Sequence, residues 1–287
     1  MIWAFLSIGA GFFDSVFYTS LKKLSDLDTY SKIALLNISS LPFLALGFLF
    51  FDMPRVSAMF YLVIFINIAL FFLAQILMIN SLKLSNLSAS IPMLSFTPVF
   101  LLLTSYLMLK EFPTLAGLFG VLLVVVGSYV LNIGELKQGY SEPIKSIFRN
   151  KGVFYMIIVA FLYSLCANLG KIGVNLSNAA YYMFSFYLIY SIFLFIIFYK
   201  NIKSNIQVLR KNLNYFALSG FSTAASEILI GIAYKLSIVP YLISLKRTSI
   251  LFSVLIGIFI FREKNYKAAI MGSLIMLAGV LLITLPQ

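Results

Sequence analysis

The sequence of 287 residues contains no histidine, one cysteine and one tryptophan, and only 10% of its residues are charged. The absence of histidine excludes imidazole metal ligands and an imidazole proton relay. Because Cys166 is alone, no internal disulfide can form, and we expect it to be a small core residue. No nucleophile–base pair, metal-ligand cluster or phosphate-binding loop is recognisable. We therefore expect no enzyme, no cofactor and no metal site.

Apolar residues, in contrast, are abundant and make up 62% of the chain. A soluble domain of this length could not bury so much apolar surface. The apolar runs are continuous rather than alternating, which indicates membrane helices and not barrel strands. The expected fold class is therefore an all-α integral membrane protein.

Ten apolar segments are long enough to cross a bilayer. They cover residues 2–21, 30–51, 58–82, 87–109, 114–133, 152–174, 178–199, 215–236, 238–260 and 266–285. The net charge of +12 is distributed unevenly, with fifteen basic residues in connectors after odd-numbered spans and four after even-numbered spans. The positive-inside rule then places the odd connectors in the cytoplasm and both termini outside, in an inner (cytoplasmic) membrane. Such charge sets orientation and lipid contacts, and it does not indicate nucleic acid binding.

An internal repeat appears when the sequence is aligned with itself at an offset of 152 residues. About 55 residues align without a gap, including these pairs: Lys83 with Lys235, Ser85 with Ser237, Glu111 with Glu263, Gly120 with Gly272, and Gly127 with Gly279. Each repeat holds five spans, an odd number, so the two halves must have opposite orientation. We expect a first repeat over residues 1–133, a connector over 134–151 and a second repeat over 152–287. Inverted repeats are typical of secondary transporters.

The repeated segments also carry a family resemblance. They read SLKLSNLSASIPMLSFTPVFLLLTSYLMLKEFPTLAGLFG and KLSIVPYLISLKRTSILFSVLIGIFIFREKNYKAAIMG. In the first, a short turn precedes a span with prolines, which ends at an acidic residue before a glycine-rich span. The chain resembles the drug/metabolite transporter superfamily, in its ten-span branch of two EamA-type domains. We expect the acidic residues Glu111 and Glu263 to cap or tie down tight turns.

Two cations, Lys246 and Arg247, lie side by side inside the ninth span, where each costs ~2.5–3.5 kcal/mol to insert. The pair resembles the motif with which the triose-phosphate and nucleotide-sugar branches of the superfamily hold a substrate phosphate, which implies an anionic ligand. The alternative is that both cations only form ion pairs with Asp14 and Glu227. Glu227 and Lys246 each lie about nine residues from the turn between spans eight and nine, which predicts equal depth and pairing.

Further candidates follow from the repeat, since Gln75 is equivalent to Glu227 and Ser95 to Arg247. Tyrosines are weaker candidates, because they are more often interfacial anchors in membrane proteins. The predicted substrate-binding residues are Lys246, Arg247, Glu227, Asp14, Gln75, Ser95, Tyr163 and Tyr241.

The predicted function is secondary transport of a small organic anion or amino acid by alternating access. The alternative is a flippase for a polyprenyl-phosphate-linked or other lipid-linked anion. The expected partners are this substrate and the membrane lipids; the sequence indicates no oligomeric state.

Overall fold

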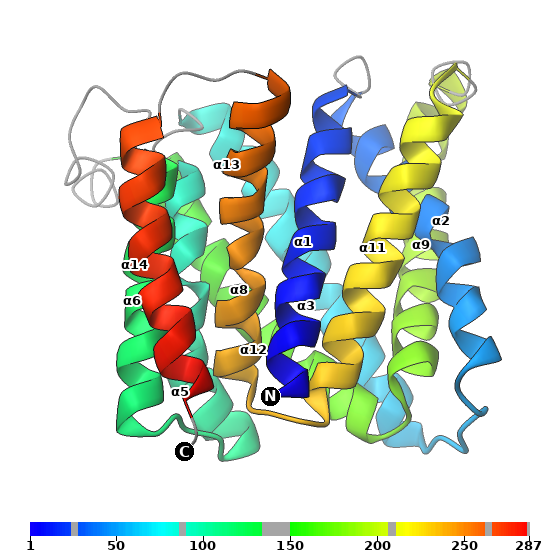
Figure 1. Cartoon of the computed structure of the whole chain (residues 1–287). Helices are drawn as coiled ribbons and strands as arrows, with labels where there is room; N and C mark the ends of the chain where they lie inside the picture. Colours follow the sequence, from blue (N-terminus) through cyan, green and yellow to red (C-terminus); the bar gives the residue numbers. More distant parts are fainter. Residues whose placement is uncertain (24–27, 86–89, 134–149, 206–210, 262–265, 286–287) are drawn as a thin grey trace.

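Helices account for all the regular structure in the part of the chain that the computed structural model describes. The described residues are 1–23, 28–85, 90–133, 150–205, 211–261 and 266–285, and they contain no strand. In chain order the helices are α1 (Ile2–Lys23), α2 (Thr29–Ala45), the 3₁₀ helix η1 (Leu46–Leu49), α3 (Ala58–Leu84), the 3₁₀ helix η2 (Ile91–Phe96), α5 (Thr97–Leu109), α6 (Leu115–Ile133), α8 (Lys151–Asn175), α9 (Ala179–Ser204), α11 (Leu213–Tyr234), α12 (Val239–Lys246), α13 (Thr248–Phe261) and α14 (Tyr266–Thr284) (Figure 1).

These helices confirm the all-α membrane fold and its ten spans. Seven helical segments are long and apolar enough to cross a bilayer, and α6 and α14 contribute two shorter apolar helices. The remaining span is the ninth in chain order and is formed by α12 and α13 in succession. Both ends of the chain lie at the same end of the helix bundle, called here the terminal end (Figure 1). Most of the predicted connector 134–151 and the turn residue Glu263 lie outside the described residues.

Spans four and nine are each interrupted at equivalent positions. The 3₁₀ helix η2 gives way to α5 between Phe96 and Thr97, and α12 gives way to α13 at Arg247. At the repeat offset of 152 residues, the start of α5 at Thr97 corresponds to Ser249, one residue after the start of α13 at Thr248. The continuous ninth span that we expected is therefore wrong in detail. Local side chains contribute to the interruption, since the Thr248 hydroxyl donates to the Leu245 carbonyl at 2.7 Å and competes with backbone pairing.

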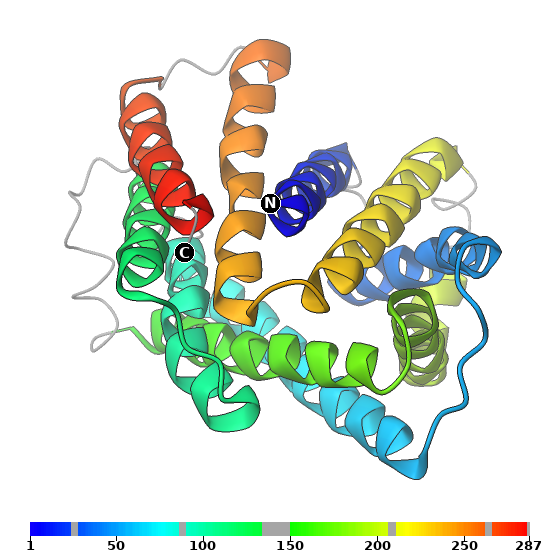
Figure 2. The ribbon, with the colours of Figure 1, turned by 60° about the horizontal axis from the view of Figure 1, so that its bottom comes forward.

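Helix packing relates the two halves of the chain. The helix α1 packs along α11, and α3 packs along α8, with α8 and α3 side by side in Figure 2. In the repeat register, α1 is equivalent to α8 and α11 to α3, so these two contacts exchange with one another. The most extensive contact across the halves, α6 with α14, exchanges with itself. This packing supports the proposed inverted repeat.

Glycines allow the close approach of α6 and α14. A Cβ atom added at Gly120 would lie 2.8 Å from the Gly279 carbonyl, and one added at Gly127 would lie 2.7 Å from the Gly272 carbonyl. These are the glycines that the repeat aligned. Gly120 lies against Gly279, and its repeat equivalent Gly272 lies against Gly127. Small residues let membrane helices approach until their backbones touch, which maximises van der Waals packing. The glycine register therefore has a packing cause.

Substitution of Gly127 by alanine tests this contact. We expect Gly127→Ala to destabilise the protein by ~1–3 kcal/mol through overpacking, because the new methyl would also lie 2.5 Å from Met276 Cγ. The matched control is Gly9→Ala, whose methyl would meet only the Leu229 side chain at 3.4 Å, and which should be neutral or stabilising. Thermal unfolding in detergent compares both. Equal midpoints for the two variants would contradict the packing role.

Candidate functional site

The Lys246 ammonium lies between two carboxylates in the interior of the helix bundle. Its Nζ atom is 3.2 Å from Glu227 Oε1 and 3.4 Å from Asp14 Oδ2. The three side chains are 17–24% exposed, so they are largely removed from solvent. The second Asp14 oxygen, Oδ1, accepts a 2.6 Å hydrogen bond from the Ser226 hydroxyl. The pairing of Glu227 with Lys246 that equal depth predicted is therefore present, and Asp14 joins it.

Local backbone geometry brings these groups together. Lys246 is the last residue of α12, seven residues or ~10 Å from its start at Val239, which places it far from either membrane surface. Asp14 reaches it because α1 approaches the end of α12 at Gly11. A Cβ atom at Gly11 would lie 2.7 Å from the Lys246 carbonyl oxygen, so only glycine permits this approach.

Arg247 occupies the interruption between α12 and α13 and has a different environment. Its Nη2 group donates a 2.9 Å hydrogen bond to the Thr97 hydroxyl, whereas its buried Nε–H has no hydrogen-bond partner. No carboxylate of the described residues lies within ion-pair distance of it. Asp14, Tyr18 and Tyr163 lie within electrostatic range. A buried donor without a hydrogen-bond partner is costly, so this N–H needs a partner that the described residues do not supply.

Both halves of the chain contribute to this site. Asp14 and Thr97 belong to the first half, and Glu227, Lys246 and Arg247 belong to the second. The interrupted spans supply the contact, because Thr97 begins α5 just after η2 and Arg247 follows α12. Interrupted helices at an interface between repeats are where transporter binding sites are typically built.

Three other predicted residues lie on η2, α3 and α8. Ser95 is buried in η2, two residues before Thr97. Gln75 is half-buried in α3, and its buried Oε1 atom has no hydrogen-bond partner. Tyr163 of α8 is within electrostatic range of Arg247, and its hydroxyl lies 3.8 Å from Met78 Sδ. The Gln75 acceptor, like the Arg247 Nε–H donor, is a buried polar atom without a hydrogen-bond partner, which is unusual in a folded protein.

Tyr241, the last predicted residue, has a structural position. It lies near the start of α12, and its hydroxyl accepts a 3.1 Å hydrogen bond from the Thr114 backbone N–H at the turn before α6. Its ring stacks on Trp3 with centroids 6.0 Å apart. These contacts tie the terminal ends of α1, α6 and α12 together, and the structure does not bring Tyr241 to the four charges.

Sequence reasoning missed three residues of the site. Tyr18 lies within electrostatic range of all four charged groups, and Ser226 and Thr97 supply the hydroxyl contacts described above. Tyr18 had a detectable signal, because it is four residues after Asp14 and therefore on the same helix face. Ser226 adjoins Glu227, but nothing in the spacing shows that its hydroxyl reaches another helix.

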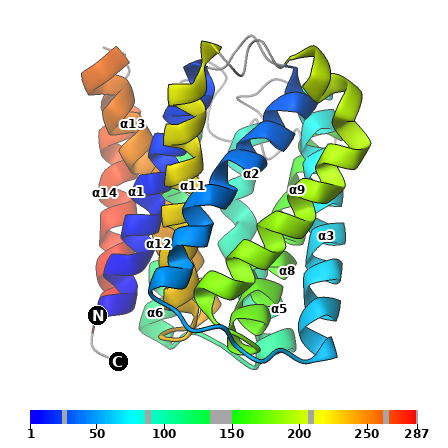
Figure 3. The same cartoon turned by 90° about the vertical axis from the view of Figure 1, so that its right-hand side faces the viewer.

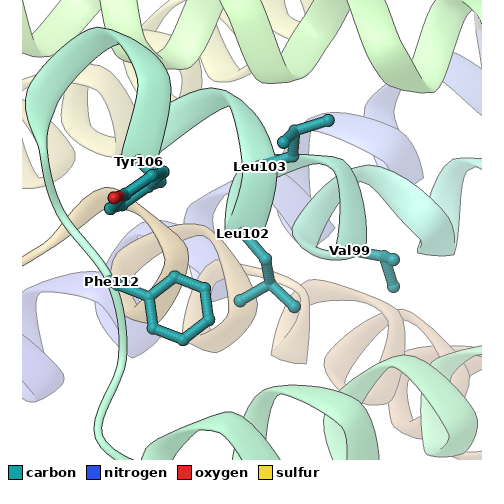
Figure 4. A pocket seen from close by; sticks show the side chains of 5 residues that line it. All are labelled: Val99, Leu102, Leu103, Tyr106 and Phe112. Carbon is teal, nitrogen blue, oxygen red and sulfur yellow. The ribbon is translucent and has the colours of Figure 1, made fainter.

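A separate apolar groove lies on α5. Its walls are Val99, Leu102, Leu103, Tyr106 and Phe112, and its volume is 460 Å³ (Figure 4). Leu103, Tyr106 and Phe112 are each more than half exposed, so the groove is on the outer surface of the bundle. A binding pocket for a small polar molecule needs a few convergent polar groups, which these walls do not provide beyond the Tyr106 hydroxyl. The groove suits an apolar chain instead.

These features define a class: a ten-span helical membrane protein with a charged site between two halves of five spans. Residues 1–133 match the model of the EamA-like transporter family, which confirms the EamA resemblance for that part of the chain. The resemblance of Lys246 and Arg247 to the triose-phosphate and nucleotide-sugar branches stays a prediction, since both residues lie beyond the matched segment.

Comparison with solved structures shows the same fold elsewhere. One crystal structure of a protein superposes with a TM-score of 0.78 at 14% sequence identity, over 99% of this chain and 97% of that chain. At this identity the likeness establishes the fold alone. No curated protein matches the sequence.

Removal of the Lys246 charge tests the central ion pairs. We expect Lys246→Met to destabilise the protein by ~2–4 kcal/mol, because two carboxylates would remain largely buried without a cation. The triple variant with Asp14→Asn, Glu227→Gln and Lys246→Met should recover most of this loss, since it leaves neither carboxylate charged without its cation. Thermal unfolding in detergent measures both variants. If Lys246→Met were as stable as the wild type, the two carboxylates would not depend on the Lys246 charge for their stability.

Proposed function

We propose that the protein is a secondary transporter for a small organic anion, or for an amino acid through its carboxylate, and that it works by alternating access. The observation that carries this proposal is the unpaired Nε–H of Arg247 inside the membrane. An interior cation without a carboxylate partner is expensive, and such residues in membrane spans are functional by default. An anionic substrate would compensate the charge.

The two cations have separate roles in this proposal. Lys246 is held by Asp14 and Glu227 and acts as a fixed structural charge. Within the described part of the chain, the Arg247 side chain is hydrogen-bonded to one neutral hydroxyl, from Thr97, and its planar guanidinium suits bidentate contact with a carboxylate or phosphate. The sequence left open whether the pair binds substrate or only forms ion pairs. These contacts favour an ion-pairing role for Lys246 and a substrate-binding role for Arg247.

The charge balance suggests how transport could be coupled. Asp14, Glu227 and Lys246 together carry a net charge of −1, and Arg247 carries +1. A bound anion would neutralise Arg247 and leave the −1 group to take up a proton on a carboxylate. Protonation of Asp14 or Glu227 would then weaken its pairing with Lys246, which gives a proton gradient a direct effect on the site. Exchange of one anion for another requires no such step.

A ligand screen with Arg247 variants tests the proposal. The panel holds organophosphates, carboxylates, amino acids, organic cations and polyprenyl phosphates, and the measurement is the unfolding temperature in detergent. An anion present at 100 times its Kd should stabilise the wild type by about 2.7 kcal/mol. We expect Arg247→Ala to weaken its binding roughly 10- to 100-fold, because a charged hydrogen bond is lost, and Arg247→Lys to be intermediate.

Controls decide whether the effect is local. Arg55 is an exposed arginine in the connector after η1, so Arg55→Ala should leave the response of the protein to the anion unchanged. Uptake of the same anion into proteoliposomes should follow the binding order of the variants. Stabilisation by organic cations alone, equal in wild type and Arg247→Ala, would instead assign the site to Asp14 and Glu227.

The second candidate, transport of a lipid-linked anion, is favoured by the apolar groove on α5 (Figure 4). An isoprenoid or acyl chain could lie in this groove on the outer surface while its phosphate binds Arg247. The phosphate would bind Arg247 in the same way as a small anion, so the hydrocarbon chain of the substrate distinguishes the two candidates.

Filling the groove tests the second candidate. Leu103 is 57% exposed on the groove wall, so Leu103→Trp should obstruct the groove without disturbing the core. If the substrate is lipid-linked, this variant should lose stabilisation by polyprenyl phosphate and keep stabilisation by small phosphates. An unchanged response to polyprenyl phosphate would remove the groove from the transport path.

A further inference from the structure

A second buried ion pair lies at the terminal end of the bundle, away from the site. The Nζ atom of Lys171, near the end of α8, is 2.5 Å from Oε1 of Glu111, which follows α5. The two side chains are only 11% and 16% exposed. The α5 helix ends at Lys110 in the left-handed conformation, with φ 58°, which turns the chain sharply before Glu111. Neither partner belongs to the proposed anion site, so this pair has no role in the function so far.

This pair holds the beginning of α12. The second Glu111 oxygen, Oε2, accepts a 3.0 Å hydrogen bond from the Val239 backbone N–H, the first residue of α12. Lys171 also donates a 2.6 Å hydrogen bond to the Ser237 carbonyl in the turn between α11 and α12. The carboxylate caps a helix N-terminus, where it satisfies an unpaired N–H and faces the positive end of the helix dipole. Glu111 thus caps a helix 128 residues away in sequence, rather than its own turn.

The four groups join two separate bundles. In the α1 bundle, α1 packs on α11, α12 and α13; in the α8 bundle, α8 packs on α3, η2 and α5. Glu111 and Lys171 belong to the α8 bundle, and Ser237 and Val239 belong to the α1 bundle. Between the bundles, α12 contacts both α5 and α8 at the terminal end. The hydrogen bonds from this ion pair to Ser237 and Val239 therefore span the interface that must separate if the terminal end opens.

At the opposite end of the molecule, the described helices pack less closely across the two bundles. The repeat equivalent of α12 is η2, which packs on α5, α6 and α8 and makes no comparable contact with α1 or α13. A similar inequality appears at the side, where α2 packs along both α9 and α11 (Figure 3), while the equivalent helix α9 touches α3 only slightly. The two halves are equivalent in sequence register, but their helices pack more closely at the terminal end than at the opposite end. Such asymmetry is expected for one end state of a rocking motion, here with the terminal end closed.

We propose that Glu111 and Lys171 form a lock that closes the terminal end of the transport path by holding the start of α12 against the α8 bundle. The lock also positions the site, because Lys246 and Arg247 follow directly at the far end of α12. By the positive-inside rule this end faces outward, so the structure would be the inward-facing state. The role in transport rests on the proposed function, but the closure itself can be measured without any substrate.

A buried reporter next to the lock tests the closure. Leu242 of α12 is completely buried, in the same apolar cluster as Leu101 of α5 and Leu169 of α8. In a Cys166→Ala background, Leu242→Cys should react slowly with a maleimide in purified, detergent-solubilised protein. Adding Glu111→Gln and Lys171→Met removes both charges together, so no unpaired charge remains in the fold. We expect labelling to become roughly 5- to 100-fold faster, the range of a typical conformational coupling.

Matched variants make the outcome decisive. Lys235 lies at the same end, but among the described residues its ammonium is hydrogen-bonded only to the Ser177 carbonyl, at 3.4 Å, so Lys235→Met should leave labelling slow. Lys171→Arg keeps the charge and should also label slowly. If the neutral double variant unfolds at the wild-type temperature and still labels slowly, the pair is only a structural contact and the lock is disproved. Fast labelling in a protein that binds no anion would support the lock and refute the proposed substrate instead.

Discussion

The interior position of Lys246 between two carboxylates constrains much of the rest of the structure. A lone charge in the hydrocarbon region costs several kcal/mol, so three helices must keep both carboxylates within about 3.4 Å of the Lys246 ammonium. This requirement fixes the end of α12, the approach of α1 at Gly11 and the depth of Glu227 on α11. Arg247 follows Lys246 directly, so its position in the helix interruption is determined by the same contacts.

The sequence predicted the contacts that depend on depth or register along the chain. Glu227 and Lys246 were paired correctly because only a short turn joins their helices, so counting residues gives their depth. The repeat aligned Gly120 and Gly127 with Gly272 and Gly279, and the same glycines pack α6 against α14. Ten spans followed from apolar length alone.

The contacts that the sequence could not predict depend on packing between distant helices. Asp14 reaches Lys246 only because Gly11 lets α1 approach the α12 backbone, and no spacing encodes that distance. Tyr241 was a candidate ligand by residue type, but its hydroxyl is used at the turn before α6. Glu111 was expected to cap or tie down the turn in which it lies. Its carboxylate instead caps the start of α12, which lies beside α5 only in the folded bundle.

The two buried ion-pair groups differ in a way that suits different tasks. Lys246 has two carboxylates and no carbonyl partner among its described contacts, so loss of one charge by protonation still leaves it paired. Lys171 has one carboxylate and one carbonyl, and both partners lie on opposite sides of a bundle interface. The first arrangement preserves a charged site while its protonation changes. The second loses only its hydrogen bonds to Ser237 and Val239 when the bundles separate, and the Lys171–Glu111 pair stays within one bundle, which suits a reversible closure. Because α12 connects the two groups over ~10 Å, the proposed lock and the proposed anion site share a single short helix.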